Sequence, residues 1–339
     1  MNLIIPKKYQ TPLDNYDMQN AIEKIRFNFQ LELSKALKLK RVSAPLFVSR
    51  NTGINDDLSG KERPVNFDIP DLKSEAEVVQ SLAKWKRVAL DKYNFHVYKG
   101  LWTDMNAIRR DEHLDNLHSI YVDQWDWEKI IKDEDRNLEY LKQTVRNIAE
   151  AIYNTSLIIK KKYPQIKVNI KKDVYFITAQ KLEDMYPNLS PKQRENEICK
   201  KHKTVFLIGI GDKLKSGKAH DFRAPDYDDW SLNGDLLYYH KTLDSALEIS
   251  SMGIRVNPET LLAQLKKAKK EERINLDYHQ MLLNNKLPQT IGGGIGQSRL
   301  CMLLLGCCHV GEVQSSVWAK EDVEECLKNG IRLLWNMTI

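Results

Sequence analysis

Apolar positions recur at steps of three and four residues in the first part of the chain. From about residue 17 to 39 this spacing predicts one long amphipathic helix, whose apolar stripe is formed by Ile22, Ile25, Phe29, Leu33, Ala36 and Leu37. Residues 41–49 then have the pattern of a strand that contains Pro45, which is tolerated at a sheet edge or a bulge. A long helix with an edge strand suits a two-fold dimer interface, although ordinary core packing would give the same pattern.

Farther along, apolar and polar residues alternate on both sides of a charged turn. Residues 101–110 and 118–128 are predicted to form two strands of an antiparallel hairpin. Because successive side chains of a strand point to opposite faces, Gln124 and Asp126 share one face, and Arg109 at the end of the other strand can reach the same wall. An amide and a carboxylate at this spacing suit the amino and carboxyl groups of an amino acid. A solvated sheet face would have the same pattern.

The other periodic segments alternate between helices and strands. Helices are predicted at residues 78–90 and 134–162, and strands at 173–178, 205–210, 234–238 and 246–255. Residues 223–230 are rich in turn formers and carboxylates. Residues 51–60 are predicted to be a loop, with Asp56 in its middle.

Glycines dominate residues 292–296, which precede Arg299 and an apolar helical run. Glycine has no side chain to hold a ligand away, so this backbone can pass close to a flat or highly charged ligand. Arg299 is expected in the first turns of the following helix, near free backbone N–H groups. This arrangement predicts a polyphosphate site. The spacing excludes a dinucleotide fingerprint, because Gln297 stands where that motif needs glycine, and it does not match a P-loop.

Two carboxylates lie on the last predicted hairpin. Asp235 and Glu248 belong to its two strands, and the hairpin can bring them side by side. Mg²⁺ prefers few protein oxygens and several from substrate and water, so two carboxylates that face a polyphosphate suit it. Two acidic residues on neighbouring strands are also common without any metal.

Composition narrows the class of protein. The 339 residues are 42% hydrophobic and 29% charged, and the formal charge of +6 is spread over lysine clusters that are typical of solvated helix faces. The five cysteines have no paired C-x-x-C spacing, which favours reduced thiols and a cytoplasmic protein. No apolar stretch reaches the length of a membrane span, and residues 1–10 lack the apolar core of a signal peptide.

In chain order, these segments resemble the catalytic domain of class II aminoacyl-tRNA synthetases: a long helix and a strand with proline, an arginine before a hairpin, and a glycine-rich strand before a helix with arginine. Four runs resemble more closely the ammonia-dependent asparagine synthetases, or aspartate:ammonia ligases, namely residues 81–87, 118–128, 223–230 and 290–300. The likeness covers nearly the whole chain. Two departures are Gln80, where the family commonly has His, and a short passage at 230–233, which implies a shorter lid.

The resemblance implies an α+β fold with a mostly antiparallel central sheet flanked by helices. It implies that residues 1–339 form one catalytic domain. It also implies a cytoplasmic homodimer that binds neither membranes nor nucleic acids. Synthetases of the aspartate and asparagine branch that charge tRNA have an anticodon-binding module ahead of the core. Residues 1–16 and 306–339 leave no room for such a module, which favours an enzyme that does not charge tRNA.

The implied reaction is the amidation of L-aspartate by ammonia to asparagine through a β-aspartyl-adenylate, with ATP as co-substrate and AMP and pyrophosphate as products. The resemblance assigns ATP to Arg109, Gly294, Gly296 and Arg299, and Mg²⁺ to Asp235 and Glu248. It assigns aspartate to Lys84, Asp126, Asp228, Ser251 and Arg255. Asp56 and Gln124 would face the β-carboxyl group and the incoming ammonia.

Two alternatives remain at this point. A ligase that uses the same adenylate to modify a protein or a different amine would exchange pyrophosphate with another amino acid. An inactive, synthetase-like sensor would hold ATP without turnover. The intact set of Arg109, Asp235, Glu248 and Arg299 argues against the inactive sensor, because a protein without turnover does not need it.

Overall fold

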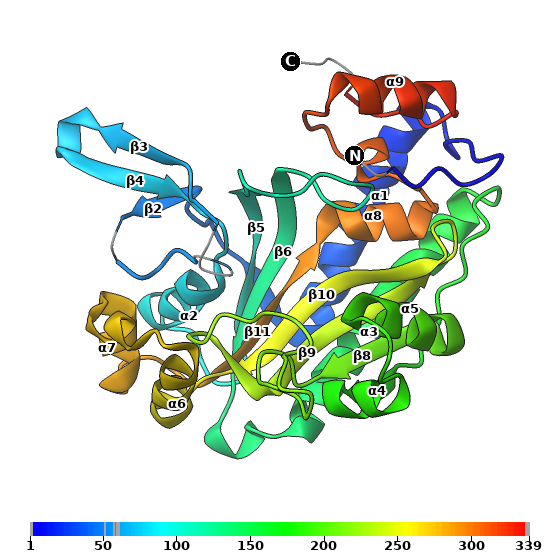
Figure 1. Cartoon of the computed structure of the whole chain (residues 1–339). Coiled ribbons are helices and arrows are strands. Elements are labelled where there is room, and N and C mark those ends of the chain that lie inside the picture. Colours follow the sequence, from blue (N-terminus) through cyan, green and yellow to red (C-terminus); the bar gives the residue numbers. More distant parts are fainter. Residues whose placement is uncertain (1–2, 51, 57, 59–61, 336–339) are drawn as a thin grey trace.

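An eight-stranded sheet forms the centre of the computed structural model, which describes residues 3–50, 52–56, 58 and 62–335 (Figure 1). Its order is β1-β5-β6-β11-β10-β9-β8-β7. The strands are β1 (Leu39–Arg41), β5 (Gly100–Ile108), β6 (Tyr121–Ile130), β7 (Tyr175–Thr178), β8 (Thr204–Ile208), β9 (Asp228–His240), β10 (Ser245–Arg255) and β11 (Thr290–Gly296). The two edge pairs, β1 with β5 and β7 with β8, are parallel, and the inner pairs are antiparallel. The predicted α+β fold with a mostly antiparallel sheet is confirmed.

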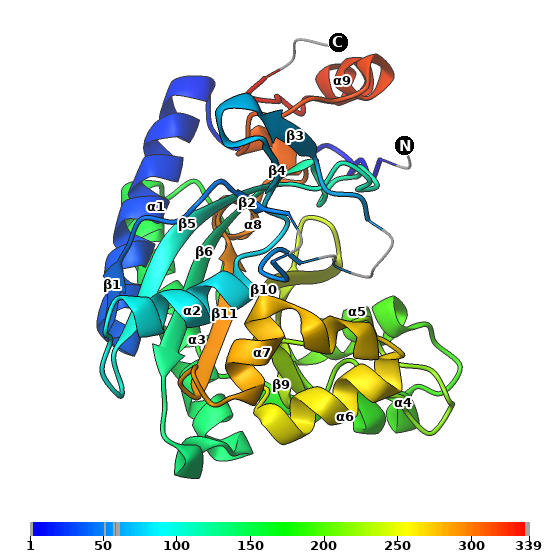
Figure 2. The same cartoon turned by 90° about the vertical axis from the view of Figure 1, so that its left-hand side faces the viewer.

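Helices cover both faces of this sheet (Figures 1 and 2). On one face, α1 (Asn15–Leu37), α3 (Leu138–Lys162) and α8 (Gln297–Leu305) share the main apolar core with the sheet. On the other face, α2 (Ala83–Lys92) packs near β5 and β6, and α5 (Pro191–His202) packs near β8 to β10. The remaining helices are α4 (Ala179–Met185), α6 (Pro258–Ala268), α7 (Asp277–Leu283) and α9 (Lys320–Lys328), with 3₁₀ turns at Pro70–Leu72, Asp133–Asp135, Glu271–Asn275 and Val310–Glu312.

The alternation of β6 decides which face becomes the core. Trp125 and Trp127 are almost fully buried on the side of α1, where the Trp125 ring lies 4.7 Å from that of Phe29. Their neighbours Gln124 and Asp126 therefore point to the opposite face, because side chains alternate along a strand. The sheet thus has an apolar side against α1 and α3 and a polar side near α2.

The predicted long helix is confirmed as α1. Asp14 caps its first turn by accepting a hydrogen bond from the Asp17 backbone N–H at 2.8 Å, and Lys38 ends it in the left-handed conformation. The buried stripe contains Ile22, Ile25, Phe29 and Leu33, as the periodicity indicates.

The single strand predicted at residues 41–49 is wrong. The chain forms β1, which ends at Arg41, and then β2 (Phe47–Ser49), which belongs to a separate three-stranded sheet with β4 (Ser74–Val78) and β3 (Asn66–Ile69). Pro45 lies between the two strands, where its missing N–H disrupts no ladder. The helix predicted at residues 78–90 begins later, at Ala83, because Val78 is the end of β4.

The other predicted elements are present, and most have small shifts of their ends, whereas β9 extends well beyond the predicted strand, from Asp228 to His240. The hairpin at 101–128 is β5 and β6, the helix at 134–162 is α3, and the strands at 173–178, 205–210, 234–238 and 246–255 are β7, β8, β9 and β10. The turn-rich segment 223–230 already joins β9 at Asp228. Of the predicted loop at 51–60, Asn51, Asp57, Ser59 and Gly60 lie outside the described residues.

All five cysteines are buried and unpaired, as predicted for a chain with reduced thiols. In the part of the chain that the structure describes, no helix is long and apolar enough to cross a membrane.

Candidate active site

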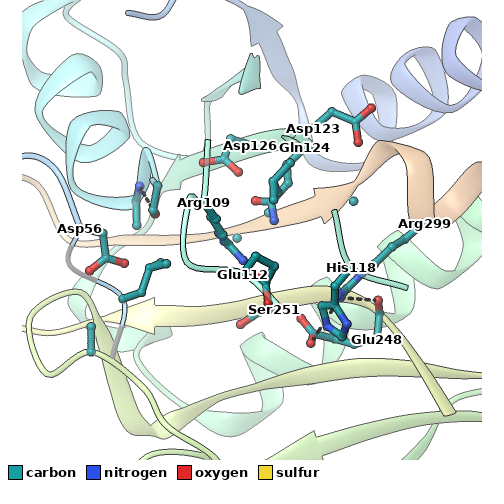
Figure 3. A pocket seen from close by; sticks show the side chains of 18 of the residues that line it. Asp56, Arg109, Glu112, His118, Asp123, Gln124, Asp126, Glu248, Ser251 and Arg299 are labelled. Atoms are coloured by element: carbon teal, nitrogen blue, oxygen red, sulfur yellow. Dashed lines mark hydrogen bonds and ion pairs between the residues drawn. The ribbon is translucent and has the colours of Figure 1, made fainter. Parts of the chain in front are cut away.

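The polar side of the sheet forms the floor of a cavity of about 450 Å³ (Figure 3). Its lining brings together eleven of the thirteen residues predicted to form the site: Asp56, Arg109, Gln124, Asp126, Asp228, Glu248, Ser251, Arg255, Gly294, Gly296 and Arg299. Lys84 and Asp235 are not part of this lining. Segments from both halves of the chain therefore meet at one cavity.

Glycines of β11 make room for the polar side chains of β6. In the antiparallel register, Gly296, Gly294 and Gly292 stand opposite Gln124, Asp126 and Glu128. A Cβ at position 294 would lie 2.2 Å from the Gln124 Oε1 atom, and one at position 292 would lie 1.8 Å from the Glu128 Oε2 atom. Both distances are too short for a real contact. The glycines therefore make room for the side chains of the neighbouring strand, whereas the close approach of a ligand to this backbone stays a prediction.

Two arginines reach the cavity from different elements (Figure 3). Arg109 follows β5, and its backbone N–H donates to the Ile120 carbonyl at 2.9 Å, which holds the end of the hairpin together. Its Nε atom is buried and has no hydrogen-bond partner among the described residues. Arg299, in the first turn of α8, donates from Nη1 to the Glu248 carbonyl at 3.3 Å, and the same atom lies 3.6 Å from the Glu248 Oε2 atom. The Arg109 guanidinium is thus available for an anionic ligand.

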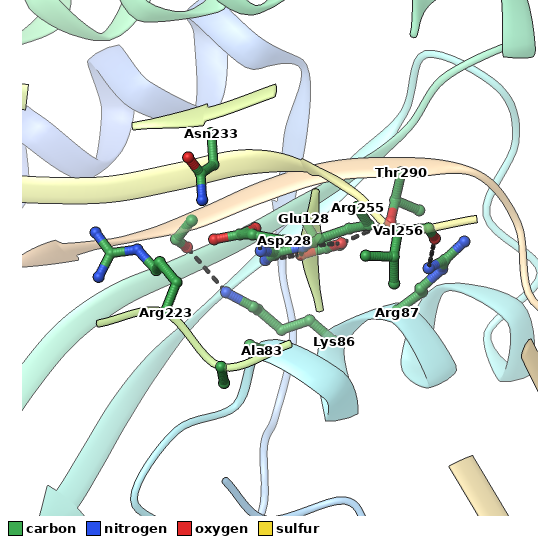
Figure 4. A network of polar contacts seen from close by, with 12 residues as sticks. Ala83, Lys86, Arg87, Glu128, Arg223, Asp228, Asn233, Arg255, Val256 and Thr290 are labelled. Carbon is green, nitrogen blue, oxygen red and sulfur yellow. Dashed lines mark hydrogen bonds and ion pairs between the residues drawn. The ribbon is translucent and has the colours of Figure 1, made fainter. Parts of the chain in front are cut away.

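A buried network of charges forms the back of the site (Figure 4). Arg255 is 2% exposed and donates from Nε to Glu128 Oε1 at 2.9 Å, from Nη2 to Glu128 Oε2 at 2.6 Å, and from Nη1 to Asp228. Thr290 Oγ1 also donates to Glu128, at 2.7 Å. Burial opposes ionisation of Glu128, but the Arg255 guanidinium outweighs it and lowers the pKa of this carboxyl. Arg255 is therefore a charge held rigidly between two carboxylates.

Lys86, rather than Lys84, enters the cavity. The Lys86 Nζ atom donates to the Gly293 carbonyl at 2.8 Å and lies 3.0 Å from the Asp126 Oδ2 atom. Burial lowers the pKa of this amine, and the neighbouring Asp126 opposes the shift. The Lys84 Nζ atom instead lies 3.5 Å from Asp226, which also accepts from Arg273. The structure thus does not place Lys84 where it was predicted, and puts Lys86 in the site.

The carboxylate pair Asp235 and Glu248 is offset. Across the β9–β10 hairpin Asp235 stands opposite Ser251, and Glu248 stands opposite Leu237, with a bulge directly after Glu248. Asp235 binds Arg223, whereas Glu248 lies near Arg299. Burial raises the pKa of Asp235, Arg223 opposes the shift, and the negative charge of Glu248 adds to it. Each carboxylate thus has an arginine beside it.

The donors at this pair are of the type that suits Mg²⁺. The described residues contain no group of three or more His, Cys, Asp or Glu side chains that could hold a metal alone. Two carboxylates that influence each other's ionisation fit an ion that takes most of its oxygens from phosphate and water. A metal at this place would depend on a polyphosphate ligand.

Comparisons with known proteins decide the family. The sequence profile of the aspartate-ammonia ligases matches residues 16–330. The chain belongs to the aspartate-ammonia ligase family. An aspartate–ammonia ligase of Lactobacillus johnsonii is 57% identical over 336 residues, which cover 98% of this chain and all of that protein. One of Pediococcus pentosaceus is 56% identical over 335 residues, with the same coverage. The resemblance to ammonia-dependent asparagine synthetases is therefore confirmed, and this family member is a ligase.

Solved structures support the fold of this ligase. Asparaginyl-tRNA synthetase of Entamoeba histolytica, in complex with asparaginyl-adenylate, matches with a TM-score of 0.66 at 14% identity. The match covers 88% of this chain and 66% of that synthetase. The class II synthetase-like fold is confirmed.

Sequence reasoning missed several residues of the ligase site. Three of them, Lys86, Arg223 and His118, line the cavity. The fourth is Glu128, which binds Arg255 behind it, and Arg223 also binds Asp235. For Lys86 the sequence carried no separate signal, and the structure shows that Ala83 and Lys86, three residues apart on one face of the helix, both line the cavity. For Glu128 the signal was the same alternation that selected Gln124 and Asp126.

Proposed function

We propose that this chain synthesises L-asparagine from L-aspartate and ammonia at the cavity, with ATP as the activating co-substrate. The β-carboxylate oxygen of aspartate attacks the α-phosphorus of ATP, and pyrophosphate leaves. The nitrogen of ammonia then attacks the β-carbonyl carbon of the adenylate, and AMP leaves. The proposal rests on one observation. Arg109 and Arg299 line the same cavity as the amide of Gln124 and the carboxylate of Asp126, in a chain of the aspartate-ammonia ligase family.

The arginines divide the phosphates between them. Arg109, whose buried Nε atom has no partner in the part of the chain that the structure describes, binds the α-phosphate as charge develops on it in the transition state. Arg299 binds the terminal phosphates, and these phosphate contacts replace its contact with Glu248. The backbone at Gly294 and Gly296 lets the nucleotide lie close to the sheet.

Asp235 and Glu248 are the residues that would hold Mg²⁺. When bound, this ion supplies positive charge that neutralises the polyphosphate and favours departure of pyrophosphate. Arg223 keeps the Asp235 carboxylate fixed on β9. Glu248 on β10 becomes available to the ion when Arg299 exchanges its contact with this carboxylate for the phosphates.

The amino acid lies over the wall of β6. The Asp126 Oδ1 atom is buried without a hydrogen-bond partner among the described residues, which suits the ammonium group of aspartate. Lys86 takes the carboxylate role first assigned to Lys84, because Lys86 lines the cavity and Lys84 does not. Arg255 and Asp228 close this end of the site together with Ser251.

The same substitution, lysine to methionine, at Lys86 and at Lys84 distinguishes the roles of these two residues. Lys86→Met is expected to raise the KM for aspartate by about 10- to 100-fold, because a charge-assisted hydrogen bond contributes about 1.5–3 kcal/mol. Lys84→Met leaves Asp226 with Arg273 and His279, so the KM for aspartate should stay close to that of the wild type. Steady-state kinetics at saturating ATP measure both values, and thermal melts confirm that each variant is folded. A larger effect of Lys84→Met would contradict the assignment.

The second half of the reaction is assigned to Asp56 and Gln124. Asp56 is 2% exposed and lines the cavity, where a carboxylate can attract ammonium and accept a proton from the attacking amine. Asp56→Asn is expected to slow ammonia-dependent asparagine formation by about 10²-fold or more and to leave pyrophosphate exchange largely intact. Equal losses in both assays would show that Asp56 does not act as the base.

One experiment tests the overall reaction. Purified protein is given ATP, Mg²⁺ and L-aspartate, with and without ammonium chloride, and AMP and asparagine are measured. The proposal predicts stoichiometric AMP and asparagine only when aspartate and ammonium are both present. Pyrophosphate exchange that depends on a different amino acid, or AMP formation without asparagine, would overturn it.

Three further features belong to the proposal. Homodimer formation is supported by α1, whose outer side exposes Tyr16, Phe27 and Leu31 by 78%, 57% and 52%. Analytical ultracentrifugation tests it, since a monomer at micromolar concentration would contradict it. A single catalytic domain over residues 1–339, and a cytoplasmic location without nucleic-acid partners, stay predictions.

A further inference from the structure

The first turn of α8 is fastened to two aspartates of neighbouring strands. Gly296 at the N-cap position has no side chain to cap the helix. Instead, the Ser298 backbone N–H donates to Asp123 Oδ1 at 3.1 Å, and the Ser298 hydroxyl donates to Asp123 Oδ2 at 2.7 Å. Gln297 Nε2 donates to Asp104 Oδ1 at 2.8 Å. Asp123 thus supplies from β6 what a capping residue supplies within a helix.

Each of these aspartates also holds an arginine from the N-terminal part of the chain. Arg26 of α1 donates from Nη2 to Asp123 Oδ2 at 2.7 Å, and Arg41 of β1 donates from Nη2 to Asp104 Oδ2 at 2.7 Å. The two pairs differ in burial. The Asp123 and Arg26 side chains are 4% and 37% exposed, whereas Asp104 and Arg41 are 34% and 66% exposed. Solvent therefore weakens the pair with Arg41 much more than the pair with Arg26.

The helix that Asp123 fastens is the one that carries Arg299. Ser298 directly precedes this arginine, and Asp123, Ser298 and Arg299 line the same cavity. Gln314 adds to the cluster, because its Nε2 atom donates to Asp123 Oδ1 at 3.3 Å and to the Ser298 hydroxyl at 3.1 Å. Within the described chain, the Arg299 guanidinium is held only by its longer contacts with Glu248. The place of this guanidinium thus depends mainly on the first turn of α8.

A buried aspartate with four donors would also arise where only stability is needed. The geometry here indicates a role beyond stability, because both carboxylate oxygens of Asp123 accept hydrogen bonds from Ser298, the residue directly before Arg299. The neutral cap that serves other helices of this chain, such as Ser190 of α5, is replaced here by an ionised group held by an arginine of another element. A shift of this cap would move Arg299 with it.

We propose that Asp123, held in place by Arg26, is a positioning residue that sets Arg299 for the terminal phosphates of ATP. This inference rests on the proposed function, in which Arg299 binds those phosphates. It assigns to α1 a part in ATP binding, although Arg26 itself is not part of the cavity lining. It predicts an effect on ATP and not on aspartate, because in the described chain the Asp123 carboxylate is hydrogen-bonded to Arg26, Ser298 and Gln314 and to none of the side chains assigned to aspartate.

Arg26→Ala and Arg41→Ala are the matched pair of variants that tests the proposal. Arg26→Ala is expected to raise the KM for ATP by about 10-fold with the KM for aspartate unchanged, because small displacements of a phosphate-binding group have large kinetic effects. Arg41→Ala should leave both values within about twofold, since it breaks an exposed ion pair. Equal changes for ATP and aspartate in Arg26→Ala, or no change for either, would overturn the proposal.

Asp123→Asn and Ser298→Ala give the second line of the test. Asp123→Asn should raise the dissociation constant of ATP in isothermal titration by about 10- to 100-fold, with that of aspartate unchanged. If Asp123→Asn does not fold, Ser298→Ala decides alone, because it removes one donor without leaving a buried charge unpaired. Its ATP affinity should fall, and an unchanged affinity would overturn the proposal. Wild-type protein that makes no asparagine would refute the proposed function instead, which keeps the two failures apart.

Discussion

Replacement of Arg109 by alanine is expected to lower kcat for aspartate-dependent pyrophosphate exchange by about 10²- to 10³-fold, the range seen when one donor to a developing anion is removed. Negative charge moves onto the non-bridging oxygens of the α-phosphate as the β-carboxylate attacks it. The Arg109 guanidinium lines the cavity, and its buried Nε atom has no partner within the described chain, so its charge is available to these oxygens. The loss should appear in kcat more than in the KM for ATP, because the contact strengthens in the transition state.

Arg110 provides the matched control for this prediction. It follows Arg109 directly, is exposed and is not part of the cavity lining. Arg110→Ala removes the same charge from the next position of the same segment, so long-range electrostatic attraction of ATP changes to a similar extent in both variants. Exchange kinetics for the two variants at low and at high salt separate a local from a long-range effect. A similar loss of kcat in Arg110→Ala would contradict the role of Arg109.

The fold was predictable wherever a long periodic pattern decides the structure. The stripe of α1 and the alternation of β5 and β6 each extend over many residues, so chance patterns are rare. The strands β1 and β2 have three residues each, which is too short for a period to be recognised. Their assignment to two different sheets depends on pairing with β5 and with β4, which are distant in the chain. The error at residues 41–49 therefore has a physical cause.

Part of the site was predictable, namely the residues whose side-chain orientation follows from their position in a strand or at its end. Gln124, Asp126 and Arg109 are of this kind. Lys84 and Lys86 are two residues apart on α2, so their side chains point about 200° away from each other around the helix, and a run of basic residues does not show which of them faces the cavity. The environment of Arg255 could not be derived from local pattern, since its partner Glu128 lies on a strand that the sheet separates from β10 by β11.

The same distance across the sheet makes Gly292 sensitive to substitution. Gly292→Ala is expected to lower the free energy of unfolding by about 3–5 kcal/mol, the range for breaking a buried ion pair by displacing one partner. The added Cβ would lie 1.8 Å from the Glu128 Oε2 atom and 2.6 Å from the Arg255 Nη2 atom. Glu128 is fully buried, so the carboxylate must leave Arg255 or the strands must separate. Chemical denaturation, with the slope checked for two-state behaviour, measures the loss.

Gly296→Ala is the matched control, because it makes the same change on the same strand. Its added Cβ would meet the Arg299 side-chain carbons at 3.2–3.5 Å, which a small movement of that flexible side chain relieves. We therefore expect a loss below about 1 kcal/mol, the range of a surface-like change. Comparable losses at both positions would mean that β11 needs glycine for its backbone rather than for the charges of β6. A large loss at Gly292 alone would show that this glycine stabilises the fold through the Glu128–Arg255 pair.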